Sequence, residues 1–140
     1  MKFFLCAICL LFSIQLSAQP LEGRWKGYFV EDTDKRQGNA KQFLTIEFIG
    51  VPDSGYKVYS YTRLSGFEAQ CELSLVVGPE DSVFLEEVKL LNPRKRESTC
   101  FQRMKLKLMK ADNNAGLTLE GSWDSEKPAC GHGRMFFRKQ

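Results

Sequence analysis

The chain has 140 residues, of which 43% are hydrophobic and 26% are charged, with a formal net charge of +3. This length suits a single domain with one modest core. So small a net charge gives no reason to expect binding to nucleic acid or to an anionic membrane, and we expect neither.

The first residues have the anatomy of a secretory signal peptide. Lys2 supplies a positive charge, an apolar run covers 3–12, and smaller, more polar residues follow as far as Gln19. The alternative, a membrane anchor, needs an apolar run of about 20 residues, and this run is shorter. We therefore expect 1–19 to be a signal peptide and 20–140 to form one domain. The mature protein should be secreted or periplasmic, without stable membrane insertion.

Strand-like segments then follow one another to the C-terminus. Alternation is clearest over 67–77, where apolar residues at odd positions are separated by mostly polar ones. No helical periodicity extends beyond two turns. We predict strands at about 23–31, 42–50, 55–63, 67–77, 81–91, 100–110, 115–124 and 132–139. Such strands indicate an all-β fold, either an eight-stranded antiparallel up-and-down barrel or a sandwich, and we favour the barrel.

The predicted connections are of two kinds. Compact turns rich in Gly, Pro, Asp and Asn alternate with longer, more charged segments at 32–41, 92–99 and 125–131. In an up-and-down barrel, alternate connections lie at the same end. Long loops on a rigid scaffold often carry binding sites, so we expect the mouth of the barrel there. The alternative is that these loops are ordinary surface insertions.

Removal of the signal peptide leaves three cysteines, Cys71, Cys100 and Cys130. In an oxidising compartment they predict one disulfide and one free thiol. Cys100 and Cys130 border predicted strands at the long-loop end, so we favour their pairing, with Cys71–Cys100 as the alternative.

A Gly-x-Trp at the start of the first strand and an Arg at the end of the last resemble the pattern of the calycins. This group contains the lipocalins, fatty-acid-binding proteins and avidins, and the matching residues are Gly23, Trp25 and Arg138. The resemblance implies a barrel in which the first strand pairs with the last. Trp25 would close the tight-turn end, with the Arg138 guanidinium stacked on its ring.

The layout also resembles a group of small exported bacterial proteins. The shared features are the early Gly-x-Trp, a Leu-Glu-Glu strand at 85–87, a Leu-x-Gly-x-Trp at 119–123, and Cys-Gly at 130–131. The polar ligand contacts of avidins and the helical lid of fatty-acid-binding proteins have no counterparts in the sequence. The resemblance therefore implies a fold but no particular ligand.

Glu86 is the first candidate ligand-binding residue. It shares a strand face with Phe84, Val88 and Leu90, and this apolar face should point into the barrel. A carboxylate inside the barrel is costly unless it is paired, so Glu86 either orients a ligand or makes a structural pair. A β-bulge in this strand would place Glu87 inside instead.

Three further residues are candidates at the mouth. Arg94 and Arg96 belong to the densest run of positive charge and could attract an acidic ligand or partner, unless the run is simply a solvated loop. Trp123 would be either an aromatic at the rim or part of the core.

Catalysis is not expected. His132 is the single histidine, and its neighbour Cys130 is expected to be oxidised, which removes a Cys–His nucleophile pair. No nucleotide-binding, zinc or catalytic-triad motif is present, and we expect no cofactor and no metal.

Two functions remain. The first is an exported, non-catalytic protein that holds a small, largely apolar ligand inside the barrel. The alternative is a filled barrel that contacts a protein or glycan through its long-loop end. The volume of the inward side chains decides between the two. The bulky residues expected to point inward are Phe29, Phe48, Phe67, Phe84, Met104, Trp123 and Phe136.

Overall fold

The computed structural model describes residues 20–32, 41–64, 66–92, 100–110 and 116–140. The expected signal peptide, and with it 1–19, lies outside the described residues, as do Arg94 and Arg96. The described chain forms β1 (Gly23–Glu31), β2 (Gln42–Val51), β3 (Gly55–Leu64), β4 (Phe67–Val77), β5 (Ser82–Leu90), β6 (Gln102–Lys110), β7 (Leu117–Ser125), the 3-10 helix η2 (Pro128–Cys130) and β8 (Gly133–Lys139).

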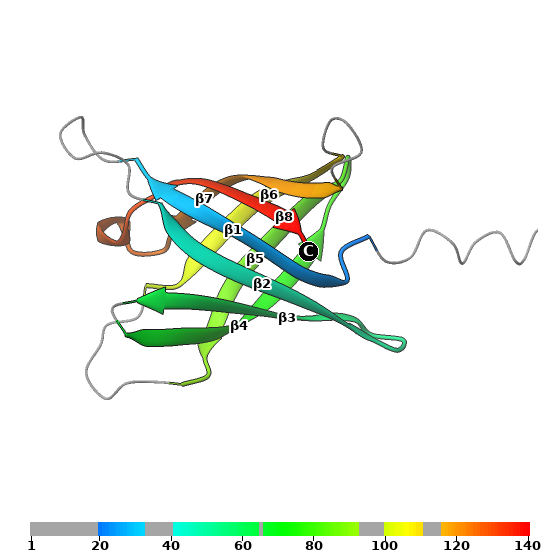
Figure 1. The fold of residues 1–140 in the computed structure, drawn as a ribbon, viewed down its shortest axis with the longest axis horizontal. Coiled ribbons are helices and arrows are strands. Elements are labelled where there is room, and N and C mark those ends of the chain that lie inside the picture. The colour runs from blue at the N-terminus through cyan, green and yellow to red at the C-terminus, as the bar shows by residue number, and fades with distance from the viewer. Residues whose placement is uncertain (1–19, 33–40, 65, 93–99, 111–115) are drawn as a thin grey trace, which may run out of the picture.

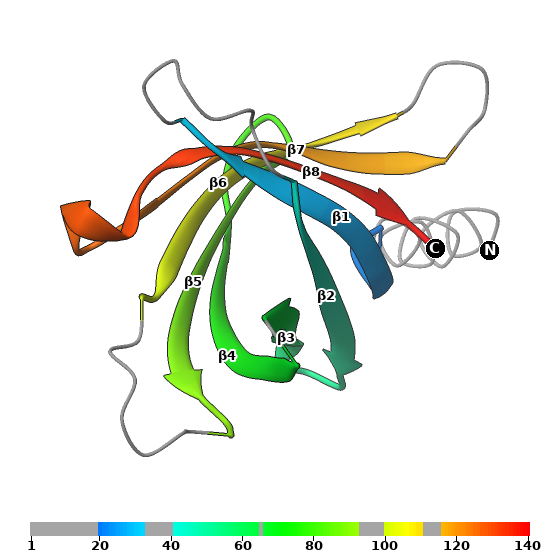
Figure 2. The ribbon, with the colours of Figure 1, turned by 60° about the vertical axis from the view of Figure 1, so that its left-hand side comes forward.

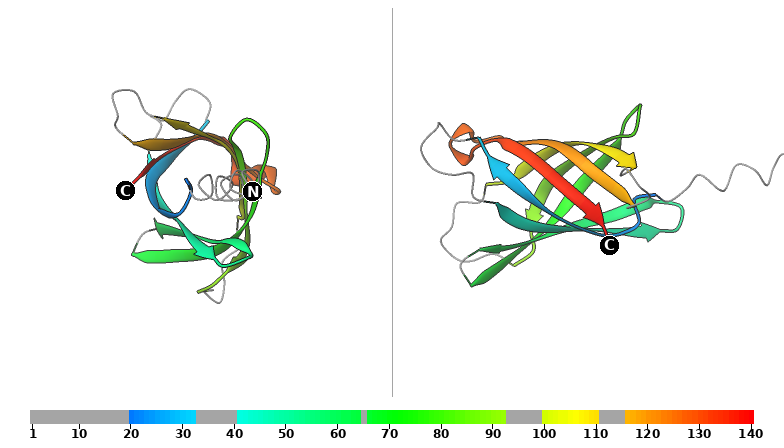
Figure 3. Two further views of the ribbon diagram at one scale, coloured as in Figure 1. Left: turned by 90° about the vertical axis from the view of Figure 1, so that its right-hand side faces the viewer. Right: turned by 45° about the horizontal axis from the view of Figure 1, so that its top comes forward.

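The strands form one closed antiparallel barrel. Each strand pairs with the next in the chain, and β8 pairs with β1 to complete the ring (Figures 1 and 3). This confirms the predicted up-and-down barrel and excludes the sandwich. The predicted strand limits agree with the observed ones to within two residues.

The two ends of the barrel differ as expected. At the tight-turn end, β2–β3 and β4–β5 are joined by short turns, in which Asp53, Glu80 and Asp81 have φ values of 61°, 55° and 60°. These left-handed conformations suit Asp in a tight turn. The opposite end is the long-loop end, where η2 lies between β7 and β8 (Figure 2). The β3–β4 connection there is short, since β3 ends at Leu64 and β4 begins at Phe67.

Trp25 closes the tight-turn end, as the calycin resemblance implied. Its side chain is fully buried, its Nε1 donates a hydrogen bond to the Leu21 carbonyl at 2.8 Å, and its ring makes an edge contact with Phe48. The segment that leads into β1 is thereby folded against the end of the barrel.

The expected stacking of Arg138 on Trp25 is wrong. Arg138 pairs with Lys26 and faces outward, whereas Lys139 is the residue opposite Trp25. The Lys139 Nζ lies 5.8 Å from the centre of the Trp25 ring and donates to the Pro20 carbonyl at 3.0 Å. The side chains of a strand alternate between its two faces, so a shift of one residue replaces one cation by the other.

Candidate functional site

The interior of the barrel is tightly filled between its two ends. Each of the eight strands contributes inward side chains with exposed fractions of 7% or less, Trp25, Phe48 and Phe137 among the largest, while Leu75, Leu90 and Leu108 are partly buried against them. A hollow large enough for a ligand would leave its walls accessible to water. Phe84 and Phe136, expected inside, instead face outward, where Phe84 is 40% exposed.

Glu87, not Glu86, is the carboxylate inside the barrel. The register of β5 against β4 shifts between Leu73, which pairs with Glu87, and Glu72, which pairs with Lys89. Val88 is the extra residue of this bulge, so Leu90 faces inward while Glu86 and Val88 lie on the outer face. The prediction for Glu86 is therefore wrong, because the bulge places Leu90 on the face opposite to Glu86 and breaks the alternation on which that prediction relied.

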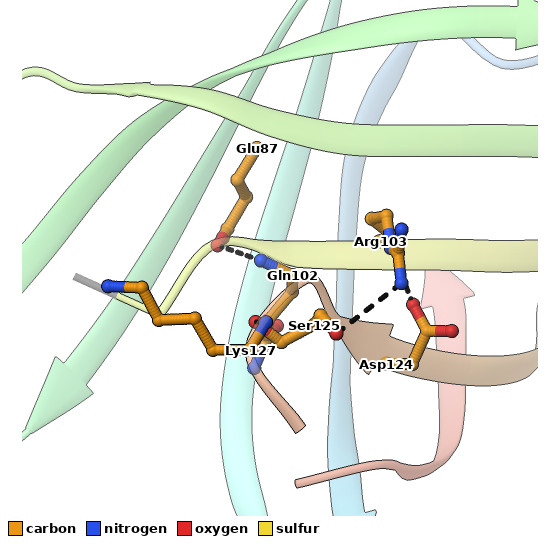
Figure 4. Close-up of polar contacts among 6 residues, drawn as sticks. All are labelled: Glu87, Gln102, Arg103, Asp124, Ser125 and Lys127. Atoms are coloured by element: carbon orange, nitrogen blue, oxygen red, sulfur yellow. Dashed lines mark hydrogen bonds and ion pairs between the residues drawn. The ribbon is translucent and has the colours of Figure 1, made fainter. Parts of the chain in front are cut away.

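The Glu87 carboxylate is 7% exposed and has two hydrogen-bond donors. The Ser60 hydroxyl donates to Oε1 at 2.8 Å, and the backbone N–H of Gln102 donates to Oε2 at 3.0 Å (Figure 4). Burial raises the pKa of Glu87, and the two hydrogen bonds offset part of that effect. Glu87 thus fixes the first residue of β6 to the interior, which is a structural role.

Cys71 lies on the same part of the interior wall, since it is the β4 residue opposite Ser60. It is a buried, free cysteine. Burial, together with the nearby Glu87 carboxylate, raises the pKa of the Cys71 thiol to about 11. The thiol is therefore protonated at neutral pH and is a poor nucleophile.

We expect Glu87→Gln to gain stability relative to the natural protein as the pH rises from about 4 to about 8. Because the pKa of Glu87 is raised in the folded state, the natural protein loses stability as the pH rises from the ordinary glutamate pKa toward the folded one. In the variant, the amide oxygen can accept from Gln102 N–H while the amide nitrogen donates to Ser60. Urea unfolding at a series of pH values measures the effect.

Glu86→Gln is the matched control for this prediction. It makes the same chemical change one residue away, on the outer face of the barrel. It should keep the pH dependence of the natural protein. Parallel stability curves for Glu87→Gln and the natural protein would show that Glu87 does not titrate in this range.

Trp123 is a core residue and not part of a rim. It is buried, its ring packs edge-on against Phe29 at 5.2 Å, and its Nε1 donates to the Val30 carbonyl at 3.1 Å. Gly133 makes this arrangement possible, since a Cβ at that position would collide with the Val30 oxygen. Trp123, on the inner face, therefore does not join Glu86, on the outer face, in a common site.

The predicted disulfide is confirmed between Cys100 and Cys130, and the alternative with Cys71 is excluded. It links the chain just before β6 to the end of η2 at the long-loop end. Because Cys130 is oxidised, it supplies no thiolate beside His132.

The candidate binding site is a groove on the outside of the barrel, with a volume of about 1100 Å³. It runs over the outer faces of β8, β1, β2 and β3 and reaches β4 at the long-loop end. We call it the outer groove. Its lining residues are the aromatic Tyr28, Phe43 and Phe136, the basic Lys26, Lys41, Arg63 and Arg138, and the others Gly27, Gln42, Leu44, Thr45, Tyr61, Glu68 and Gln140.

The aromatic residues of the outer groove form one row across three strands. Tyr28 of β1 lies directly opposite Phe136 of β8 on one side and Phe43 of β2 on the other. The Tyr28 and Phe136 rings are 5.7 Å apart and tilted by 30°. Phe43, the second residue of β2, is 72% exposed, a high fraction for a phenylalanine.

Positive charge surrounds this row. Lys41 places its Nζ 4.4 Å from the centre of the Tyr28 ring. Lys26 and Arg138 are directly opposite each other on neighbouring strands, a like-charge pairing that is destabilising. Within the described part of the chain, none of the four cations of the groove forms an ion pair.

Two acids lie on this face: Glu68, which lines the groove and stands opposite Arg63 on the neighbouring strand, and Glu47. Glu47 pairs with Arg24 at 3.7 Å and accepts a hydrogen bond from the Tyr61 hydroxyl at 3.3 Å. Burial, followed by the Glu47 carboxylate, raises the pKa of Tyr61, which keeps that hydroxyl protonated. The outer groove therefore keeps an excess of positive charge.

The outer groove was not predicted from the sequence. Its residues lie on the outward positions of four strands and become neighbours only through the barrel register. The available signal was local, because Tyr28 and Phe43 occupy positions that alternation assigns to solvent. An aromatic at such a position needs an explanation beyond the core.

The described residues contain no cluster of acidic, histidine or cysteine side chains arranged to hold a metal ion. No helix in that same part of the chain is long and apolar enough to cross a membrane. Comparisons with protein-family models, curated proteins and solved structures found no match.

Proposed function

We propose that the mature chain is an exported, non-catalytic binding module that holds an anionic macromolecule along its outer groove. The observation that carries the proposal is the exposed ring of Phe43 within a groove lined by four cations and one acid, Glu68, and none of these cations forms an ion pair among the described residues. Opposed like charges such as Lys26 and Arg138 cost stability in the free protein, and a bound anion relieves that cost.

The proposal takes up the second function expected from the sequence, that of a filled barrel acting as an interaction module. The tightly packed interior supports this choice over a small apolar ligand held inside. The outer groove reaches the long-loop end through Lys41 and Arg63, so part of the expected location is kept. The disulfide supports export, and the Trp25 closure together with the β1–β8 pairing supports a calycin-like relationship.

The test is binding to two polyanions with different backbones, polyglutamate and dextran sulfate, with neutral dextran as the blank. We expect the natural protein to bind at least one polyanion, with an affinity that falls as salt is raised. A Lys26→Gln/Arg138→Gln double variant should lose about tenfold in affinity, because it removes two unpaired cations. Isothermal titration calorimetry at two salt concentrations measures both effects.

Lys105→Gln/Lys107→Gln is the matched control, since it removes two exposed lysines from the outer face of β6, away from the groove. This control should bind as the natural protein does. The groove variant should also be at least as stable as the natural protein, because it removes a like-charge pair. Equal binding losses in the two double variants would mean that only overall charge matters, and the proposal would then fail.

A further inference from the structure

We infer that the anionic macromolecule is an acidic polysaccharide, recognised through its sugar rings as well as its charges. This inference rests on the proposed function and names the class of ligand for the same groove. Three features support an acidic polysaccharide: the spacing of the aromatic row, the polar groups beside that row, and the closure of the barrel.

The aromatic row has the spacing of a polysaccharide. Phe136, Tyr28 and Phe43 stand on three successive strands, and neighbouring strands are about 4.8 Å apart. A pyranose residue in a polysaccharide is of similar length. Phe43, which is 72% exposed, can therefore receive the C–H face of one sugar. The Tyr28 and Phe136 rings, which pack on each other with Lys41 over Tyr28, border the neighbouring sugars.

The groups that flank the row suit the rest of an acidic sugar. Lys41 and Arg63 lie toward the long-loop end, and Lys26 and Arg138 lie on the other side of the row. Cations on both sides can meet carboxylates or sulfates that project from either edge of the chain. Side-chain hydroxyls in the groove, that of Thr45 among them, can hydrogen-bond to sugar hydroxyls.

An acidic peptide fits the same groove less well. Extended peptides commonly bind by adding a strand to an open sheet edge, where main-chain hydrogen bonds supply the affinity. Each of the eight strands here has a paired neighbour on both sides, so the barrel offers no full-length open edge. A peptide could use only its side chains, whereas a polysaccharide needs only the rings, charges and polar groups that are present.

The test compares polygalacturonate and dextran sulfate with polyglutamate of matched charge number. We expect at least one of the two polysaccharides to bind about tenfold more tightly than polyglutamate. Phe43→Ala should lose about tenfold in affinity for that polysaccharide and little for polyglutamate, whereas Phe43→Tyr should keep the affinity. Phe84→Ala is the matched control, because it removes an outward ring from β5, outside the groove.

Comparison of the two sugars separates carboxylate from sulfate as the preferred acidic group. Phe43 is exposed, so Phe43→Ala should fold with a stability within about 0.5 kcal/mol of the natural protein. If polyglutamate binds as tightly as both polysaccharides, or Phe43→Ala weakens all three equally, the inference is overturned in favour of an acidic protein, while the proposed function stands. If none of the three binds, the proposed function itself fails.

Discussion

Replacement of Trp25 by alanine is expected to lower the free energy of unfolding by about 3–5 kcal/mol. Its indole is 0% exposed and makes the contact with Phe48 that closes the tight-turn end. The substitution leaves a cavity and removes the donor for the Leu21 carbonyl, which Trp25 Nε1 meets at 2.8 Å. Urea unfolding followed by circular dichroism measures the loss.

Trp25→Phe separates the cost of the cavity from the cost of the lost hydrogen bond. It keeps an aromatic ring at the barrel end but removes the hydrogen bond to Leu21, so its loss should be clearly smaller than that of alanine. Phe43→Ala, which removes an exposed ring, provides the reference for a large side chain outside the core. A loss below about 1 kcal/mol for Trp25→Ala would mean that the indole does not close the barrel.

Removal of the Cys100–Cys130 disulfide is expected to cost about 3–4 kcal/mol, through the entropy of the unfolded chain. The bond joins residues that are 30 apart in the sequence, and the closed loop contains both β6 and β7. A Cys100→Ala/Cys130→Ala variant should unfold at a correspondingly lower urea concentration. Addition of a reductant should shift the natural protein to the same midpoint.

Cys71→Ala is the control for thiol chemistry. Because Cys71 is a free, buried thiol, this variant should still respond to the reductant, whereas the Cys100→Ala/Cys130→Ala variant should not. A reductant response in the double variant would point to chemistry at Cys71 instead. Unchanged stability of the natural protein after complete reduction would contradict a stabilising role for the bond.

The fold explains why the outside of this barrel is available for binding. Closure pairs every strand on both sides, and the filled interior holds the strands in one register. Outward positions are then free to vary without disturbing the core. A rigid sheet that places Phe136, Tyr28 and Phe43 in one row is a precise platform for a repeating ligand.

The sequence by itself determined the all-β class and the approximate strand limits, because these depend on local alternation and on turn residues, and it favoured a closed barrel over a sandwich. It also indicated the closure by Trp25 and favoured the correct disulfide, since both follow once the order of the strands is known. Each of these features is repeated along the chain or is set by neighbours in sequence.

The tertiary structure alone decided which side of a strand faced inward at particular residues and which strands met on the outside. Glu87, and not Glu86, continues the inward alternation of Val83 and Leu85, and the bulge at Val88 then turns Leu90 to the same inward face. A register difference of one residue placed Lys139, and not Arg138, over Trp25. The outer groove joins residues from strands at both ends of the sequence, so local alternation could mark Tyr28 and Phe43 as outward aromatics but could not bring them together. Register and closure are properties of strand pairs, and they are set by packing across the whole barrel.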